Sequence, residues 1–281
     1  MENGRTKTKG RQVLLINDLA GYGKVALSAM IPVLSHMGHH IYNLPTALVS
    51  NTLDYGKFDI LETTDYIRNT ICVWKELGFH FDAVSTGFIV SDVQAKMIAD
   101  FCREQRKAGT VIFVDPIMGD DGKLYNGITE QTIAHMKELV RVSDYMVPNY
   151  TEAAYLAGME YSPEGMTREE AKELIRRLQE LGARSMIITS ARVEHQDMVI
   201  LYDHASGERH FLPFTSIPVR FPGTGDIFSA VFMGRLLEGQ TLLDSTKKAM
   251  DTVSTLIERN KDNEDKFKGI PLETCLEVLE A

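Results

Sequence analysis

The chain has 281 residues, enough for one large domain or two small ones, and its 44% hydrophobic and 25% charged residues are typical of a soluble globular protein. Its net charge of −9 argues against a nucleic-acid-binding surface. No apolar run approaches the ~20 residues that a membrane span needs. Three widely spaced cysteines indicate reduced thiols, so we expect a cytoplasmic protein without disulfides.

Residues 1–10 are polar and basic and lack an apolar segment, which predicts a disordered leader rather than a signal peptide. After them, short apolar segments alternate with amphipathic ones. Strands are expected at 12–17, 41–50, 81–86, 110–114, 145–147 and 185–189. Helices are expected at 24–37, 61–77, 92–107, 129–140, from 149 onward, and at 167–181. Pro45 indicates an edge strand or a bulge.

The pattern changes near the C-terminus. Residues 198–203 and 209–214 predict a hairpin, and helices are expected at 227–237, 242–258 and 272–279. Repeated strand–helix alternation predicts an α/β fold with a doubly wound, mainly parallel sheet and right-handed crossovers. Because no linker or composition break divides the chain, we expect a single domain over residues 11–281.

Ligand sites in such sheets lie at the carboxyl ends of the strands. The loops at those ends begin at Asp18, Ser50, Gly87, Asp115, Asn149 and Thr189. One of these loops carries Asp115, Asp120 and Asp121, which predict either a Mg²⁺ site beside substrate phosphates or a solvated turn. Asn149 and Glu152 indicate either a helix cap or a further part of that site.

The segment Pro222–Asp226 precedes the helix expected at 227–237. Its glycines allow backbone N–H groups to approach an anion closely, and a helix N-terminus adds positive potential. A carboxylate at this place, Asp226, is suited to take a proton from an alcohol while a phosphoryl group is held nearby. Taken alone, the segment more readily indicates an ordinary helix N-terminus in which the acid stabilises the dipole.

Six motifs in order resemble the ribokinase superfamily and, within it, the vitamin B6 kinases of bacterial type, over about residues 11–260. The motifs are Asn17–Gly23, Ser85–Phe88, Asp115–Asp120, Val147–Glu152, Ile188–Ser190 and Gly223–Asp226. The resemblance implies a ribokinase-like single domain without a large lid. It also implies transfer of the ATP γ-phosphate to the 5′-hydroxymethyl group of pyridoxal, pyridoxamine or pyridoxine. Mg²⁺, often a monovalent cation such as K⁺, and a homodimer belong to the same expectation.

The resemblance also implies roles for individual residues. Asp226 is the expected base, and the amides of Gly223, Thr224 and Gly225 are the expected anion hole. The residues expected near ATP are Asp115, Asn149, Glu152, Thr189, Ser190 and Tyr125. The residues expected near the metal are Asp115, Asp120 and Glu152. The residues expected near the acceptor are Asn17, Asp18, Ala47, Ser50, Phe88 and Asp226.

Two other functions remain open from the sequence. Hydroxymethylpyrimidine (phosphate) kinases share the superfamily, but they commonly carry Cys where this chain has Asp226. A nucleotide-binding regulator that kept the fold and lost turnover would have no need of a base within an intact anion hole. This chain also departs from the B6 pattern, with Thr52-Leu53 where His-Thr is frequent and Phe88 where Tyr is frequent.

Overall fold

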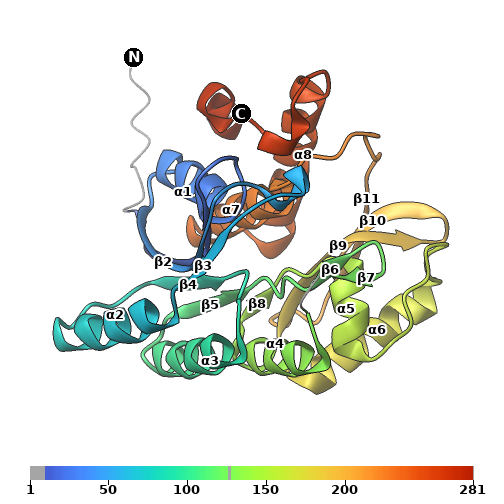
Figure 1. Cartoon of the computed structure of the whole chain (residues 1–281). Helices are drawn as coiled ribbons and strands as arrows, with labels where there is room; N and C mark the ends of the chain where they lie inside the picture. The colour runs from blue at the N-terminus through green and yellow to red at the C-terminus, as the bar shows by residue number, and fades with distance from the viewer. Residues whose placement is uncertain (1–9, 126–127, 281) are drawn as a thin grey trace, which may run out of the picture.

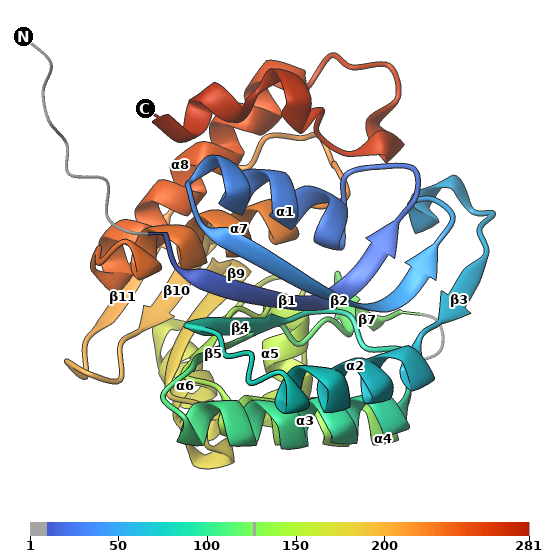
Figure 2. The same ribbon diagram turned by 90° about the vertical axis from the view of Figure 1, so that its left-hand side faces the viewer.

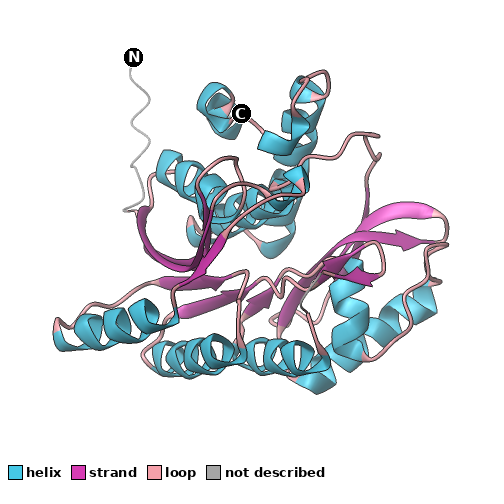
Figure 3. Ribbon diagram, viewed as in Figure 1, coloured by secondary structure: helices cyan, strands magenta, loops and turns pink. Residues whose placement is uncertain are grey.

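A nine-stranded sheet runs through the molecule, in the order β11-β10-β9-β8-β5-β4-β1-β2-β3 (Figures 1 and 3). The computed structural model describes residues 10–125 and 128–280, so the predicted leader, apart from Gly10, lies outside the described residues. The strands of the sheet are β1 (Gln12–Ala20), β2 (His40–Val49), β3 (Ile60–Glu62), β4 (Ala83–Thr86), β5 (Val111–Val114), β8 (Tyr145–Met146), β9 (Ser185–Val193), β10 (Gln196–Tyr202) and β11 (Arg209–Pro213). Two short strands, β6 (Gly119–Asp120) and β7 (Lys123–Leu124), form a separate hairpin.

Helices cover both faces of the sheet. The helices are α1 (Ala26–His36), α2 (Thr64–Glu76), α3 (Asp92–Lys107), α4 (Glu130–Val142), α5 (Tyr150–Ala157), α6 (Arg168–Leu181), α7 (Thr224–Leu237) and α8 (Leu242–Asn260). Short 3₁₀ turns are η1 (Leu53–Tyr55), η2 (Lys266–Lys268), η3 (Leu272–Thr274) and η4 (Leu276–Glu280). Helices α1, α7 and α8 lie on one face with the C-terminal turns, and α2 to α6 lie on the other (Figures 1 and 2). Each face buries its own apolar cluster against the sheet.

The strand order reverses beside β1. The chain leaves β1 for its neighbour β2 on one side, and later strands β4, β5, β8 and β9 continue on the other side, all parallel to β1. Only β3, β10 and β11 join the sheet with antiparallel pairing. The expected doubly wound, mainly parallel fold is therefore confirmed, and its switch point lies between the carboxyl ends of β1 and β4.

Most predicted elements are confirmed, with several differences. Asp18 and Thr189, where loops were expected to begin, lie within strands, because β1 continues to Ala20 by pairing with β2 and β9 continues to Val193 by pairing with β10. The helix expected from residue 61 begins at Thr64, because Ile60–Glu62 pair with Ala47–Val49 and extend the sheet. The helix expected at 272–279 consists of 3₁₀ turns. The polar loop after β5 contains the β6–β7 hairpin, and Met118, directly before β6, is fully buried. The expected bulge at Pro45 is present, since the β1–β2 register shifts directly after the Asn17–Pro45 pair.

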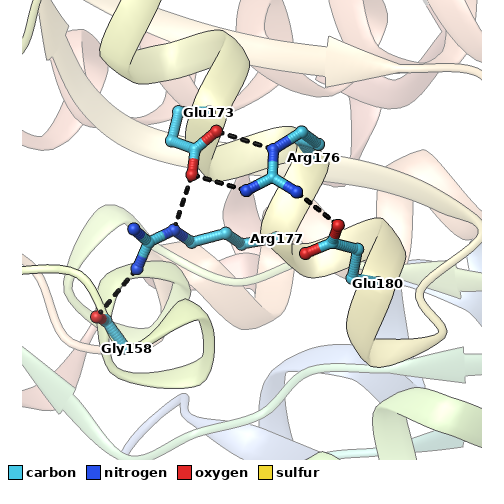
Figure 4. Close-up of polar contacts among 5 residues, drawn as sticks. All are labelled: Gly158, Glu173, Arg176, Arg177 and Glu180. Carbon is cyan, nitrogen blue, oxygen red and sulfur yellow. Dashed lines mark hydrogen bonds and ion pairs between the residues drawn. The ribbon is translucent and has the colours of Figure 1, made fainter.

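The outer face of α6 is charged (Figure 4). Glu173 accepts hydrogen bonds from both Arg176 and Arg177, and Arg176 also pairs with Glu180. Exposed pairs of this kind contribute at most about 1 kcal/mol each. Arg177 in addition donates to the carbonyl of Gly158 at 3.2 Å, which ties α6 to the C-terminal end of α5. This face is a solvated helix surface.

None of the helices in the described part of the chain combines the length and apolar character that a membrane crossing requires. All three cysteines are free thiols, Cys72 exposed and Cys102 and Cys275 buried.

Candidate active site

Asp226 lies in the first turn of α7, directly after a glycine turn. Gly223, the residue that precedes the helix, has a φ of 85°, a left-handed conformation that favours glycine. The Asp226 carboxylate is partly buried, and each of its oxygens accepts one hydrogen bond. Ala26 N–H donates to Oδ2 at 2.8 Å, and the Asn17 side-chain amide donates to Oδ1 at 3.4 Å. Helix α7 and the carboxyl end of β1 therefore hold this carboxylate between them.

Four acids share this edge of the sheet, and burial is the largest cause of the raised pKa of each. Burial raises the pKa of Asp226 to about 6, against the lowering effect of its two hydrogen bonds. Burial and the charge of Asp226 raise the pKa of Asp18 to about 7 and that of Asp115 to about 8. Burial and the charge of Asp115 raise the pKa of Glu152 well above its ordinary value. Acids brought together in this way favour either protons or bound cations.

The acids do not form a metal cage by themselves. Within residues 10–125 and 128–280, no group of three or more His, Cys, Asp or Glu side chains is close enough to hold a metal ion alone. Asp115 and Glu152 nevertheless repel each other electrostatically, and Asp120 is partly buried beside Asp121. Mg²⁺ commonly takes only one or two carboxylates and completes its shell with phosphate oxygens and water. The residues present fit a magnesium ion that arrives with a nucleotide.

Asn149 and Glu152 form a reciprocal capping box at the start of α5. Asn149 Oδ1 accepts from Glu152 N–H at 3.0 Å, and Glu152 Oε2 accepts from Asn149 N–H at 2.8 Å. Their remaining contacts reach the β6–β7 hairpin: Asn149 Nδ2 donates to the Gly119 carbonyl at 2.8 Å, and Met118 N–H donates to Glu152 Oε1 at 3.0 Å. The capping interpretation is thus confirmed, and the same two side chains hold the hairpin that leads to Tyr125.

The other residues expected near ATP lie around this capping box. Thr189 is beside Asn149 across the strand ends, with its N–H donating to the Pro148 carbonyl at 2.9 Å. Ser190 is exposed and has a φ of 52°, a strained conformation for a serine. Tyr125 is 42% exposed at the end of the hairpin. Burial of its hydroxyl and the negative charges of Asp120 and Glu152 raise its pKa. Thr189 and Ser190 thus lie in β9, and Tyr125 directly follows β7.

The residues expected near the acceptor lie in β1 and β2 or shortly after β2 and β4. Phe88 is partly buried, and its carbonyl accepts from the Thr46 hydroxyl at 2.8 Å. Ala47 is fully buried. Ser50 is exposed, and its hydroxyl is engaged with Asn51 and with the N–H of Asp59. Asp18 lies within β1, near its carboxyl end, and its neighbour Asn17 is only 2% exposed.

Several contacts at this site have no signal in the sequence. Ala26 donates to Asp226 from a left-handed backbone with a φ of 48°. Ser229, one turn after Asp226, donates to Asp115 at 3.2 Å. Gln94, fully buried, donates to the Thr46 carbonyl at 2.8 Å and so supports the Phe88 loop from α3. Only the polar character of Ser229 and its distance of three residues from Asp226, one helical turn, could have indicated such a role.

Comparison with known proteins shows the family. A model of the family described as phosphomethylpyrimidine kinase matches residues 26–270, most of the chain. The chain belongs to this family. The expected place among ribokinase-like vitamin B6 kinases is confirmed, and so is the expected enzyme class, a phosphotransferase with an alcohol group as acceptor.

Similar proteins cover nearly the whole chain. The pyridoxal kinase PdxY of Burkholderia thailandensis is 25% identical over 268 residues, which span 90% of this chain and 89% of that protein. A crystal structure from Bacteroides thetaiotaomicron, provisionally described as a phosphomethylpyrimidine kinase, is 34% identical with a TM-score of 0.91, and covers 99% of this chain and 96% of that one. The pyridoxal kinase of Lactobacillus plantarum is 27% identical with a TM-score of 0.85, and 96% of each chain is covered.

Proposed function

We propose that this kinase transfers the γ-phosphoryl group of ATP to the 5′-hydroxymethyl group of pyridoxal, pyridoxamine or pyridoxine. Asp226 is the general base, and the N–H groups of Gly223, Thr224 and Gly225 form the anion hole for the moving group. Phe88, Ser50 and Asp18 line the acceptor side, whereas Ala47, also expected there, is fully buried and presents no surface to a ligand. The nucleotide side has Asp115, Asn149, Glu152, Thr189, Ser190 and Tyr125.

The observation that carries the proposal is the Asp226 carboxylate, held by two N–H donors beside open space. A Cβ added at Gly225 would meet no atom of a residue beyond its own turn within 4 Å, so the turn that carries Asp226 faces open space. With a pKa of about 6, Asp226 is mostly ionised at neutral pH and can accept the hydroxyl proton as the oxygen attacks phosphorus. The aspartate also favours the B6 branch over the hydroxymethylpyrimidine branch.

Relatives support the choice of acceptor. A second crystal form of the Bacteroides thetaiotaomicron protein, 34% identical with a TM-score of 0.89, contains pyridoxal. The curated relatives from Burkholderia thailandensis and Corynebacterium diphtheriae are named pyridoxal kinase PdxY. The family as a whole carries the name of a pyrimidine kinase, which keeps hydroxymethylpyrimidine as the alternative acceptor.

The cofactors follow from the same proposal. Bound Mg²⁺ would neutralise phosphate charge, and Asp115, Asp120 and Glu152 are the residues that we propose hold it together with ATP oxygens and water. Because both Glu152 oxygens already accept backbone N–H groups, we expect Asp115 to be the stronger ligand. A requirement for K⁺ and the cytoplasmic location stay predictions.

The homodimer also stays a prediction. Large apolar side chains are exposed on β2, on β3 and in the loop between them. These side chains are Leu48, Leu53, Tyr55, Phe58, Ile60 and Leu61. Contiguous apolar surface of this kind is often covered by a partner, and a second copy of this chain is the partner that we propose.

The test is an acceptor panel with ATP and Mg²⁺: the three B6 vitamers, hydroxymethylpyrimidine, ribose and adenosine. We expect the highest kcat/KM for a B6 vitamer, by about tenfold or more over hydroxymethylpyrimidine. A preference for hydroxymethylpyrimidine would keep the mechanism and reject the proposed acceptor. Absence of turnover on the whole panel would favour the nucleotide-binding regulator.

Replacing Phe88 by Ala should weaken vitamer binding specifically. Its ring is the expected stacking surface for the pyridine ring, and such aromatic contacts contribute about 0.5–1.5 kcal/mol beyond the buried area. We expect the vitamer KM to rise about tenfold while the ATP KM changes less than about twofold. Phe79→Ala, at an exposed phenylalanine before β4, is the matched control. An unchanged vitamer KM in Phe88→Ala would place the ring elsewhere.

A further inference from the structure

Asn17 lies at the switch point of the sheet, under the active site rather than in it. Its side chain is 2% exposed and makes four polar contacts. Oδ1 accepts from Phe88 N–H at 2.7 Å and from Asp18 N–H at 3.0 Å. Nδ2 faces Asp226 Oδ1 at 3.4 Å and the sulfur of Met30 at 3.8 Å.

These contacts use the whole hydrogen-bonding capacity of the amide. A side-chain amide has two acceptor positions on its oxygen and two N–H donors. Both acceptor positions of Asn17 face backbone N–H groups, which also settles the orientation of the amide, since the reverse would set N–H against N–H. Both donors point to Asp226 and Met30. No position is left for a vitamer.

The acceptor loop is fitted closely onto this amide. A Cβ at Gly87 would lie 2.4 Å from Asn17 Nδ2 and 2.6 Å from Oδ1, so only glycine allows Phe88 N–H to reach Oδ1. From the other side, Ala26 N–H holds the second oxygen of Asp226. The charge of Asp226 contributes to the raised pKa of both Asp18 and Asp115, so each of these carboxyls repels Asp226 when it is ionised. The Asn17 donor is thus one of two contacts that hold the base against this repulsion.

We propose that Asn17 is a positioning residue for phosphoryl transfer. One amide fixes the carboxylate of the base through its donor and the loop that carries Phe88 through its acceptor, so the base and the acceptor pocket keep a constant separation. This inference rests on the proposed function, because it takes Asp226 as the base and Phe88 as an acceptor contact. It replaces the expected direct contact of Asn17 with the vitamer.

The two halves of the amide can be tested separately. Asn17→Asp keeps an oxygen for Phe88 N–H but sets a second oxygen against Asp226. We expect kcat to fall about 10- to 100-fold while the vitamer KM stays within about twofold. Asn17→Ala removes both contacts, so kcat should fall similarly and the vitamer KM should rise about fivefold or more. The ATP KM should change little in either variant.

Asn260→Asp is the matched control, because Asn260 is a buried amide that donates to the Leu256 carbonyl and to Cys275 and has no hydrogen bond to Asp226 or to the Phe88 loop. It should keep wild-type kinetics whatever it does to stability. The double variant Asn17→Asp/Asp226→Asn tests whether Asn17 acts through the base. If it does, adding Asn17→Asp to Asp226→Asn should lower kcat hardly further than Asp226→Asn alone.

Three results would overturn the inference: wild-type kcat in Asn17→Asp, a raised vitamer KM with unchanged kcat in that variant, or a full multiplicative loss in the double variant. A crystal structure of Asn17→Asp gives a readout independent of activity. We expect the Asp226 carboxylate to be turned away and residues 87–90 to be unmoved. An unmoved carboxylate would reject this inference even if Asp226→Asn is inactive, whereas wild-type turnover of Asp226→Asn would reject the proposed base.

Discussion

Asp226→Asn should lower kcat by about 10²–10⁴, the range expected for loss of a general base. The amide has the shape of the carboxylate, and its oxygen can still accept from Ala26 N–H, so folding and ATP binding should be largely kept. It cannot accept the hydroxyl proton. Steady-state kinetics with the preferred vitamer measure the loss, and an ATP KM within about threefold of wild type would show that nucleotide binding survives.

Asp244→Asn is the matched control for that variant, because Asp244 is also a first-turn aspartate, in α8. It removes the same favourable charge from a helix N-terminus at a distance from the proposed chemistry, and should leave kcat unchanged. Turnover of Asp226→Asn within a few-fold of the control would exclude Asp226 as the base.

The pH profile provides a second measure of the same group. Because burial raises the pKa of Asp226 to about 6, the base is protonated and inactive below that pH and ionised above it. Log kcat/KM in wild type should therefore rise with unit slope below pH about 6 and level off above it. Asp18 and Asp115 interact with Asp226, so the observed value belongs to the group of acids. This rise of log kcat/KM with pH should disappear in Asp226→Asn. If the rise persists in that variant, it belongs to another acid.

Gly223→Ala should damage both stability and activity. A Cβ at Gly223 would lie 2.0 Å from the carbonyl oxygen of Lys24, and the residue has a φ of 85°. The Lys24 carbonyl is part of the backbone and cannot move aside as a flexible side chain can, so the turn at Gly223 must move. Left-handed strain of about 1 kcal/mol and an overpacking cost of about 1–3 kcal/mol should together lower the free energy of unfolding by roughly 2–4 kcal/mol. Displacement of the anion-hole amides should lower kcat by about 10²-fold or more. Urea unfolding and steady-state kinetics measure the two effects.

Variants at two other glycines separate the cost of left-handed strain from the loss of activity. Gly207, in the β10–β11 hairpin, has a φ of 75° but open space around a Cβ, so Gly207→Ala should show the strain alone, with normal activity. Gly225 has no left-handed φ and also faces open space, so Gly225→Ala should fold normally and lose activity by obstructing the phosphoryl site. Equal stability of Gly223→Ala and Gly207→Ala would show that the contact with Lys24 carries no cost.

The confirmed predictions share a local origin. The order of strands and helices follows from hydrophobic periodicity, and the glycine turn before Asp226 follows from residues adjacent in the chain. Asn149 and Glu152 of the capping box are only three positions apart, so the sequence also predicted this cap. Where the local signal was ambiguous, as at Ile60–Glu62, the prediction was wrong, because pairing with β2 outweighed a helical pattern.

The sequence by itself determined the fold class, the order of the elements and the candidate base, Asp226, since each depends on spacings of a few residues. Only the tertiary structure decided how the Asp226 carboxylate is held. The contact between Asn17 and Asp226 joins residues 209 positions apart, and that between Ala26 and Asp226 joins residues 200 apart. The donor from Ala26 is a backbone N–H exposed by a left-handed φ, which no side-chain pattern encodes. Both contacts exist because the parallel sheet brings the end of β1 and the start of α7 to one edge, and a periodic pattern predicts that edge without specifying which groups face each other across it.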